Sequence, residues 1–374
     1  MLTDNIKVEK DGTTYDTVAI KTKLTENKLS DLVGATVTTE GSMLVWIPRY
    51  AYRVTYYGEP EKTTIKGYSD SRGFVDTEGK TPSDMQTPTT SINVNGTIGT
   101  TNYEYYRPHP AFETDLDQGG WSKKITGIWV GKFEATGTTS AVTTIGATNK
   151  VALKNKKIGE LWSSLQNIKA GTTGSHMMKN SEWGAISYLA ESKFGRNEVA
   201  ITRNTNSSYY TGAGDYKKNQ NQNQSTTGNI YGVYDTVGGT FEYVASYIAN
   251  NKNTNGYQFA STDGASTTNN NKKQSTPFAT VYKYNDTNDT SDTNTNNYAL
   301  SLNRVFGDGI CETSTAGSGT TSWHSAYSHF ALSSIPFFLR GGYYPSTNAG
   351  SFFFYYSGGG ANFFSGSRVV CVVK

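Results

Sequence analysis

The stretch between Arg340 and Arg368 is the part of the sequence that most limits how this chain can fold. It has no charged residue between the two arginines, and its 27 positions hold nine aromatic side chains and seven glycines. A buried strand would use Val, Ile and Leu, and a solvated loop would use Lys, Glu and Asp. Rigid Tyr and Phe rings mixed with adaptable Ser, Gly and Asn are typical of antibody binding loops. The composition therefore predicts a contact surface, and burial against the chain's own loops is the alternative.

The overall composition points away from a cytosolic enzyme. Aromatic residues make up 13% of the 374 residues, with 26 Tyr, and only 17% are charged. We take this balance as typical of an extracellular or virion protein rich in β-structure. The net charge of +3 is too small to indicate a nucleic-acid partner. No apolar run reaches the ~18 residues of a membrane span and no signal peptide follows Met1. We expect surface display by another export route or through an anchor that has been removed.

The chain divides into a short extension and one large domain. Residues 1–40 are polar with short alternating runs, which predicts a β-rich N-terminal extension. Residues 41–374 form the main domain. Two stretches within it, 203–229 and 249–298, are rich in Asn, Thr, Ser and Gly and cannot bury enough apolar surface to order themselves. We expect both to be long inserted loops.

Hydrophobic patterning predicts the regular elements of the main domain. One amphipathic helix is expected over 157–169, and a second begins at a cap of Asn180 or Ser181 and runs to residue 190. Trp162 and Trp183 lie on their apolar faces, where core packing is the expected role. The other predictions are strands at 43–50, 50–57, 125–134, 298–305 and 369–373 (the last one central), a surface excursion over 58–100 and a rigid extended connection at 107–112.

Signals for catalysis or metal binding are thin. No hydrolase, metalloprotease or phosphate-binding motif is present. Cys311 and Cys371 are the only cysteines, and neither is in a CxxC pair; a disulfide between them and two unbonded thiols are equal alternatives. Asp235 and Glu242 flank a glycine turn and could supply oxygens to a structural calcium ion. Hydrogen bonds within the turn and strand are the simpler role for both, and no other cofactor is expected.

The order of several short motifs resembles a known family. In chain order they are Met43-Leu-Val-Trp-Ile-Pro, Ile128-Trp-Val-Gly-Lys-Phe-Glu134, Asn180-Ser-Glu-Trp183, Gly232-Val-Tyr-Asp-Thr-Val-Gly-Gly-Thr-Phe-Glu-Tyr243, Arg340-Gly-Gly and Gly366-Ser-Arg-Val-Val370. The series resembles the formylglycine-generating-enzyme (sulfatase-modifying factor) branch of the C-type lectin fold over residues 41–374. The resemblance implies an α+β, C-type-lectin-like domain with small antiparallel sheets, two helices and long inserted loops.

The missing cysteines separate this chain from the enzymes of that family. Those enzymes carry a reactive cysteine pair soon after Arg-Gly-Gly, but this chain has no cysteine between Arg340 and Arg368. The oxidase activity is therefore not carried over, and no enzyme activity is expected. What remains resembles the variable proteins of diversity-generating retroelements, whose corresponding segment is a diversified ligand-binding face. Mutagenesis there yields NNY codons, which cannot encode Lys, Glu, Gln, Met or Trp, and residues 341–367 contain none of these five.

The resemblance implies roles for individual residues. Those that would hold the frame are Arg340, Gly341, Gly342, Asn348, Gly366 and Arg368. Ser367 replaces the Phe that the family places before the final arginine. The positions expected to contact the ligand are Tyr343, Tyr344, Pro345, Ser346, Ser351, Phe353, Tyr355, Tyr356, Ser357, Gly358, Gly360, Asn362, Phe363, Phe364 and Ser365.

Together these observations predict a non-enzymatic receptor-binding or adhesin-like protein displayed on a bacterial cell surface or a phage virion. Its segment from Arg340 to Arg368 would contact a protein or glycan on another cell or surface. Neither a nucleic-acid partner nor a membrane span is expected. The alternatives are an oxidase related to the formylglycine-generating enzymes and a structural component of a phage tail or cell surface.

Overall fold

Two β-sheets build the main body of the protein, and both reach the stretch from Arg340 to Arg368. The computed structural model describes residues 2–3, 7–15, 26, 31, 36–39, 43–57, 64–68, 107–115, 118–137, 142–144, 150–166, 174–192, 194–197, 199–213, 221–248, 275–282, 292–301 and 305–372. The first sheet is antiparallel, with the strand order β1 (Leu2–Thr3), β5 (Met43–Pro48), β9 (Gly127–Gly131), β20 (Val369–Cys371) and β12 (His176–Met177). Strand β20 begins directly after Arg368.

The second sheet is mixed and carries much of that stretch. Its order is β14 (Thr280–Tyr282), β13 (Phe241–Ile248), β17 (Phe337–Arg340), β18 (Phe354–Ser357), β16 (Ala326–His329) and β15 (Ser318–Ser322), with β19 (Ser365–Ser367) beside β13. Strands β17 and β18 are antiparallel, with Leu339 opposite Tyr355 and Arg340 opposite Phe354. The chain therefore leaves the sheet at Arg340 and rejoins it first at β18 and then at β19.

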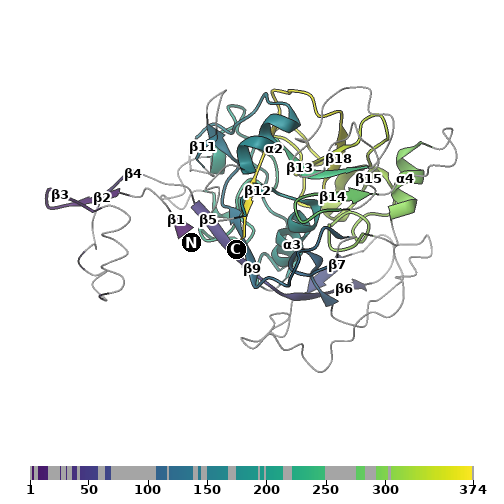
Figure 1. The fold of residues 1–374 in the computed structure, drawn as a ribbon, viewed down its shortest axis with the longest axis horizontal. Helices are drawn as coiled ribbons and strands as arrows, with labels where there is room; N and C mark the ends of the chain where they lie inside the picture. The colour runs from purple at the N-terminus through teal and green to yellow at the C-terminus, as the bar shows by residue number, and fades with distance from the viewer. Residues whose placement is uncertain are drawn as a thin grey trace.

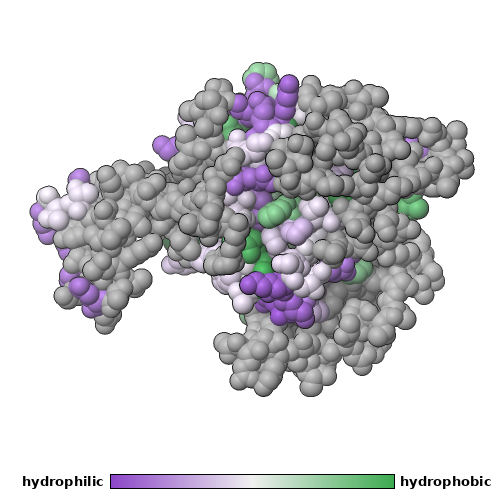
Figure 2. All heavy atoms as spheres, viewed as in Figure 1, coloured by the Kyte–Doolittle hydropathy of each residue, from purple (hydrophilic) through white to green (hydrophobic). Residues whose placement is uncertain are grey.

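Smaller sheets lie outside these two. They are formed by β2 (Lys7–Lys10), β3 (Thr13–Tyr15) and β4 (Thr36–Thr39), by β6 (Ala51–Tyr57), β7 (Thr64–Tyr68) and β8 (Arg107–Pro108), and by β10 (Thr136–Gly137) and β11 (Val142–Thr144). Figure 1 shows β2, β3 and β4 at the left, away from the main body. On the face drawn in Figure 2 their described residues are hydrophilic or neutral. Strand β1 instead pairs with β5, so the first residues described belong to the main sheet.

The mixed sheet uses both faces for the core. Successive side chains of a strand point to opposite sides. Phe338 joins a buried cluster with Trp183 of α3 (Asn180–Glu191), whereas Leu339 joins another with Trp162 of α2 (Ile158–Gln166). Helices α3 and α2 therefore contribute to opposite faces of this sheet (Figure 1).

Several sequence predictions are confirmed. The described chain is α+β, with three α-helices and several small sheets. Helices α2 and α3 lie within or close to the predicted ranges, and Trp162 and Trp183 are fully buried. Strand β20 pairs with β9 on one side and β12 on the other, so it is an interior strand. Of the predicted excursion at 58–100, β7 pairs with β6, and the rest lies outside the described residues.

Two local predictions are wrong at their boundaries. Lys179, not Asn180 or Ser181, caps α3, and its backbone N–H donates to Glu182 Oε2 at 2.9 Å. The connection at 107–112 is not extended throughout. A 3₁₀ turn, η2 (Pro110–Phe112), follows β8, because His109 Nδ1 accepts a hydrogen bond from Ala111 N and proline suits the first position of such a turn.

The strand predicted at 298–305 is also wrong. Tyr298 lies in the helix α4 (Asn294–Ser301), inside a region that was expected to be loop and strand. Asn has a low helix propensity, so tertiary contacts account for this helix. Tyr298 packs in the core, and Asn297 Nδ2 donates to Ala331 O at 3.1 Å and to Asp292 Oδ1 at 2.8 Å.

The disulfide alternative is wrong as well. Cys311 and Cys371 are both buried, and no disulfide joins them. The two side chains belong to different core clusters: Cys311 packs with Trp183 and Phe338, and Cys371 packs on the side of α2.

Reducing agent is therefore expected to leave the melting temperature unchanged, because no disulfide is present to restrict the conformations of the unfolded chain. Alkylation of the denatured chain without prior reduction, followed by mass measurement, should add two groups per molecule. A chain that gains no label and melts at a lower temperature after reduction would contradict the separation of the two thiols.

Candidate binding site

Arg340 fixes the beginning of the stretch from Arg340 to Arg368, which we call the binding segment. The side chain is fully buried and finds partners for all of its nitrogens. Its Nη1 donates to Asn180 Oδ1 at 3.0 Å and to the carbonyl of Asp308 at 2.9 Å. Its Nε donates to the carbonyl of Phe353 at 2.8 Å, and its Nη2 donates to those of Gly309 at 3.0 Å and Ser351 at 3.5 Å. Arg340 thus ties the middle of its own segment to α3 and to the turn at 308–309.

The charge of Arg340 is balanced weakly. Burial lowers the pKa of Arg340 to about 10, although the nearby Asp308 opposes the shift. Burial also raises the pKa of Asp308 to about 6, while the hydroxyl of Tyr282, which donates to Asp308 Oδ2 at 2.6 Å, acts in the opposite direction. The guanidinium therefore stays charged at neutral pH and is stabilised mainly by carbonyl dipoles.

A glycine pair follows Arg340 because the chain turns there in a conformation that other residues avoid. Gly341 has φ +81° and Gly342 has φ +74°. A Cβ atom on Gly342 would lie 2.5 Å from Ala349 Cβ, and one on Gly341 would lie 3.1 Å from Thr236 O. Both positions therefore require glycine for backbone conformation and for close packing.

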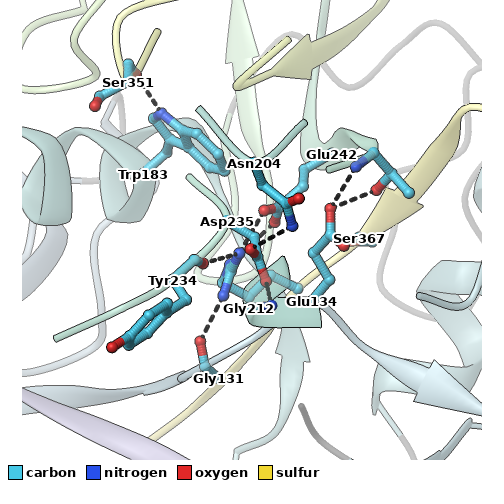
Figure 3. Close-up of polar contacts among 12 residues, drawn as sticks. Gly131, Glu134, Trp183, Asn204, Gly212, Tyr234, Asp235, Glu242, Ser351 and Ser367 are labelled. Atoms are coloured by element: carbon cyan, nitrogen blue, oxygen red, sulfur yellow. Dashed lines mark hydrogen bonds and ion pairs between the residues drawn. The ribbon is translucent and has the colours of Figure 1, made fainter. Parts of the chain in front are cut away.

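Arg368 fixes the end of the binding segment from inside the protein. Its side chain is fully buried, and it forms a bidentate ion pair with Glu242 of β13, at 3.0 Å from Nε to Oε2 and 2.5 Å from Nη2 to Oε1. It also donates to the carbonyls of Gly131 and Tyr234, both at 2.8 Å. In Figure 3, Gly131, Tyr234 and Glu242 surround the place where these hydrogen bonds meet. Arg368 therefore joins the first sheet, the 234–242 turn and the mixed sheet.

Two more buried carboxyl groups complete this cluster (Figure 3). Asp235 accepts hydrogen bonds from Asn204 Nδ2 at 2.9 Å and from Gly212 N at 2.7 Å. Glu134 Oε1 accepts from both the backbone N–H and the hydroxyl of Thr240 at 2.7 Å, whereas Oε2 has no hydrogen-bond partner. Burial, and then the charges of Asp235 and Glu242, raise the pKa of Glu134 well above its usual range. Glu134 is therefore the carboxyl of the cluster that holds a proton most tightly.

The calcium prediction fits this arrangement poorly. Both oxygens of Glu242 contact the guanidinium of Arg368, so a positive charge already occupies the place where calcium would have to lie. The oxygens of Asp235 accept hydrogen bonds from Asn204 and Gly212, which is the simpler role that the sequence allowed. Within the described residues, no group of three or more His, Cys, Asp or Glu side chains is placed to hold a metal ion.

Aromatic rings form a connected layer over the binding segment, which we call the aromatic face. Tyr343 lies 5.2 Å from Phe364 and 4.5 Å from Phe241 between ring centroids. Tyr355 stacks on Tyr356 at 4.6 Å. Further contacts of 4.5 to 6.4 Å join these rings to the others. The rings joined in this way are Tyr209, Phe241, Tyr327, His329, Tyr343, Tyr344, Phe353, Tyr355, Tyr356 and Phe364. We include the exposed Phe363, which directly precedes Phe364 and lies beside Lys154.

Most of the predicted ligand-contacting residues reach the surface. Phe363 and Phe364 are 62% and 41% exposed. Pro345 and Asn362 are also exposed, and the half-buried positions are Tyr343, Tyr344, Ser346, Tyr355, Tyr356, Ser357, Gly358 and Gly360. Burial, followed by a hydrogen bond with Tyr356, raises the pKa of Tyr355 to about 12, so this phenol stays neutral.

Three predicted contact positions are corrected, because they are buried. Ser351 sits over Trp183, whose Nε1 donates to its carbonyl at 2.6 Å. Phe353 is 2% exposed and lies among Phe241, Tyr327 and Tyr355, so it supports the aromatic face from below. Ser365 is fully buried in β19, which pairs with β13.

The predicted frame positions lie in the structure as follows. Gly341, Gly342, Gly366 and both arginines are buried, whereas Asn348 is half-buried and accepts a hydrogen bond from Tyr327 N at its carbonyl. Ser367, the departure from the family pattern, is fully buried, and its hydroxyl donates to Tyr243 O at 2.8 Å. The serine thus makes a polar contact with the mixed sheet where a Phe was expected.

Main-chain atoms make most of the contacts that hold the binding segment in place. The carbonyls of Gly359 and Asn362 accept from Ile158 N and Asn155 N, both at 2.9 Å. The carbonyl of Phe364 accepts from the backbone N–H of Phe241 at 2.7 Å. Contacts of this kind do not depend on which side chain the segment residue carries.

Sequence reasoning missed the rings that come from outside the binding segment. Tyr209 and Phe241 lie far from it in sequence, and Tyr327 and His329 precede it on a separate strand; pairing of β16 with β18 and of β13 with β17 brings three of them to the face. Tyr327 and His329 are two apart on one strand, which places them on one side, but no local pattern reveals which strand is the neighbour. Burial lowers the pKa of His329, so its ring is neutral at pH 7.

A scan of the chain against models of known protein families returns no match, and a search of curated proteins returns no similar sequence. In the described part of the chain, no helix has the length and apolar character needed to cross a membrane. The geometry of the binding segment and its frame is therefore the basis for a functional conclusion.

Replacing Glu134 with Gln is expected to change how stability depends on pH. The folded-state pKa of Glu134 is raised above its unfolded value, so its contribution to stability is fully present below the unfolded pKa and is lost as pH rises through the folded pKa. Glu134→Gln keeps the hydrogen bonds from Thr240 and cannot ionise. Between pH 5 and pH 8 the melting temperature of the variant should therefore fall less than that of the wild type. At pH 8 the variant should melt at the same temperature as the wild type or at a higher one.

Thermal melts followed by circular dichroism across this pH range would measure the effect. The exposed Glu160 provides the matched control, and Glu160→Gln should follow the wild-type curve. A Glu134→Gln variant that melts well below the wild type at pH 8 would mean that Glu134 is charged in the folded protein.

Proposed function

We propose that this protein is a non-enzymatic binding protein whose aromatic face contacts a macromolecular ligand on another cell or surface. The observation that carries the proposal is an uncharged layer of partly exposed aromatic side chains, held in place by main-chain contacts and by two buried arginines. Tyr and Phe supply large contact areas with few rotatable bonds, and they dominate binding energy at protein interfaces.

The exposure of the face favours binding over a structural role. Large apolar rings at the surface of a soluble protein expose area that water solvates poorly, and such patches mark interaction sites. Phe363 and Phe364 are the most exposed part of the face, at 62% and 41%. Between its two arginines the binding segment also contains no Asp, Glu, His, Lys or Cys side chain.

The same features support the proposal that the chain is a variable protein of a diversity-generating retroelement with a C-type-lectin-like domain. A diversified segment has to tolerate many side chains on an unchanging backbone. Contacts through main-chain atoms, with charged side chains confined to the two ends, meet that requirement. Display on a cell surface or virion, through residues outside the binding segment, completes the proposal.

Removal of four rings should abolish binding without unfolding the chain. The quadruple variant Tyr355→Ala, Tyr356→Ala, Phe363→Ala and Phe364→Ala loses the most exposed part of the face, so affinity should fall by at least about 100-fold. The probes are peptides selected from a displayed random library on the immobilised wild-type chain, and affinities are measured by biolayer interferometry. The melting temperature should fall by only a few degrees, because these rings are exposed or half-buried.

Tyr231 provides the control for this experiment. It is 67% exposed and lies outside the aromatic face, so Tyr231→Ala should bind the selected peptides as the wild type does. Equal binding by the quadruple variant would remove the face as the site. Collapse of its fold would instead support burial of the segment as its main role.

The retroelement proposal predicts a feature of the encoding locus. Near the gene there should be a near-repeat of the codons for residues 340–368, with adenines at the positions that differ, beside a gene for a reverse transcriptase. Sequencing of the locus provides the test. If both the repeat and the reverse transcriptase are missing, diversification is excluded, while binding through the aromatic face remains to be decided by the peptide experiment.

A further inference from the structure

Two positively charged side chains from outside the binding segment reach its exposed loops. Lys154 Nζ lies 5.6 Å from the ring centroid of Phe363 and 5.0 Å from that of Tyr209. Tyr209 contacts Tyr344 at 5.2 Å between ring centroids, edge to face. Two residues after Tyr344, the carbonyl of Ser346 accepts a hydrogen bond from Arg203 Nη1. Contacts through Tyr209 and the 344–346 loop therefore link the two cations at one corner of the aromatic face.

Among the described residues, no carboxylate forms a salt bridge with either cation at this corner. The salt bridges found among the described residues involve other side chains, and neither Lys154 nor Arg203 takes part in one. Arg203 Nε is also buried without a hydrogen-bond partner. The binding segment contributes no charge between its two arginines. The corner is thus positive, and its charge comes entirely from the surrounding scaffold.

The backbone at Tyr209 is held in an uncommon conformation. Its φ is +58°, in the left-handed region that non-glycine residues rarely adopt. The neighbouring chain enforces it: Tyr209 O accepts from Ala152 N at 3.0 Å, and Tyr209 N donates to Asn206 O at 3.0 Å. Strain of this kind persists where a side chain must be held in a set position, often at binding sites. Here it sets the Tyr209 ring between Lys154 and Tyr344.

We propose that Lys154 and Arg203 form a constant anion-accepting corner that takes an Asp or Glu side chain of a polypeptide ligand docked on the aromatic face. The proposal rests on the binding function proposed above and adds a fixed preference to it. A charged group beside a hydrophobic surface contributes mainly to specificity and to the rate of association. Ammonium and guanidinium groups placed next to aromatic rings keep their attraction for carboxylates while the rings exclude water.

The composition of the aromatic face favours a polypeptide as the ligand. Its Tyr and Phe rings supply large contact areas at low cost in conformational entropy, and the Ser, Gly and Asn residues between them supply adaptable hydrogen bonds. Antibody loops bind their antigens with the same residue types.

Selection from a displayed random peptide library tests the proposal. The full chain is immobilised as wild type, as Lys154→Met and as Lys123→Met. Methionine keeps an unbranched stem against Phe363 and Tyr209 but carries no charge. Lys123 is exposed and is not among the contacts of the aromatic face, so it controls for the loss of one positive charge. Melting temperatures confirm that each chain is folded.

Asp and Glu should be enriched among peptides selected on the wild type and on Lys123→Met, relative to the unselected library. This enrichment should disappear on Lys154→Met. Acidic peptides from the wild-type selection should bind Lys154→Met about five- to tenfold more weakly, and their affinity for the wild type should fall more steeply with added salt than their affinity for the variant.

The outcomes separate this inference from the proposed function. Peptides that bind the wild type but not the quadruple alanine variant, and that show no acidic enrichment, would overturn the anionic preference and leave the aromatic face intact. Acidic enrichment that persists on Lys154→Met would also overturn it. If no selected peptide distinguishes the wild type from the quadruple variant, both the proposed binding function of the aromatic face and the proposed role of the charged corner are overturned.

Discussion

Burial of two guanidinium groups is the constraint on which the rest of the structure depends. Moving a charge out of water costs several kcal/mol unless its hydrogen-bonding groups are satisfied. Arg340 meets this need almost entirely with carbonyl groups, and Arg368 meets it with Glu242 and two carbonyls. The partners come from α3, β9, β13 and two turns, so neither arginine is satisfied until these elements are assembled. The ends of the binding segment are therefore fixed by the same contacts that join the two sheets.

Much of this frame could be predicted from the sequence, but the reason for particular residues could not. The apolar runs predicted helices α2 and α3 and strands β5, β9 and β20, and the arginine–glycine pattern predicted the ends of the segment, whereas α4 was missed. Asn180 was predicted as a helix cap on local propensity, whereas its amide binds Arg340 and the hydroxyl of Tyr282 instead. A tertiary requirement overrode the local preference, and the cap moved to Lys179. Propensity describes what an isolated segment prefers, and a buried charge outweighs it.

The sequence also predicted the aromatic face only in part. Alternation along β18 explains why Phe354 joins the cluster with Trp183, while Tyr355 lies half-buried on the opposite side of the sheet, against the cluster with Trp162. A position within the segment nevertheless did not decide whether a ring is exposed on the aromatic face. Phe353 belongs to the segment but is buried, whereas Phe241 and Tyr327 lie outside the segment and are part of the face. Strand pairing between distant segments decides these placements, and a single sequence does not reveal such pairing. The aromatic face is therefore shared between the segment and the scaffold.

The division of charge explains how such a surface could change without loss of the fold. Arg368 and the carboxyl groups around it form a closed set inside the protein, and the exposed positions contribute no charge to it. The main-chain carbonyls of Gly359, Asn362 and Phe364 hold the loops whatever side chains they carry. Substitutions at exposed positions free of such contacts usually change the free energy of unfolding by about 0.5 kcal/mol or less. A binding surface built this way can be altered ring by ring, while the scaffold-borne Lys154 and Arg203 keep one charged corner constant.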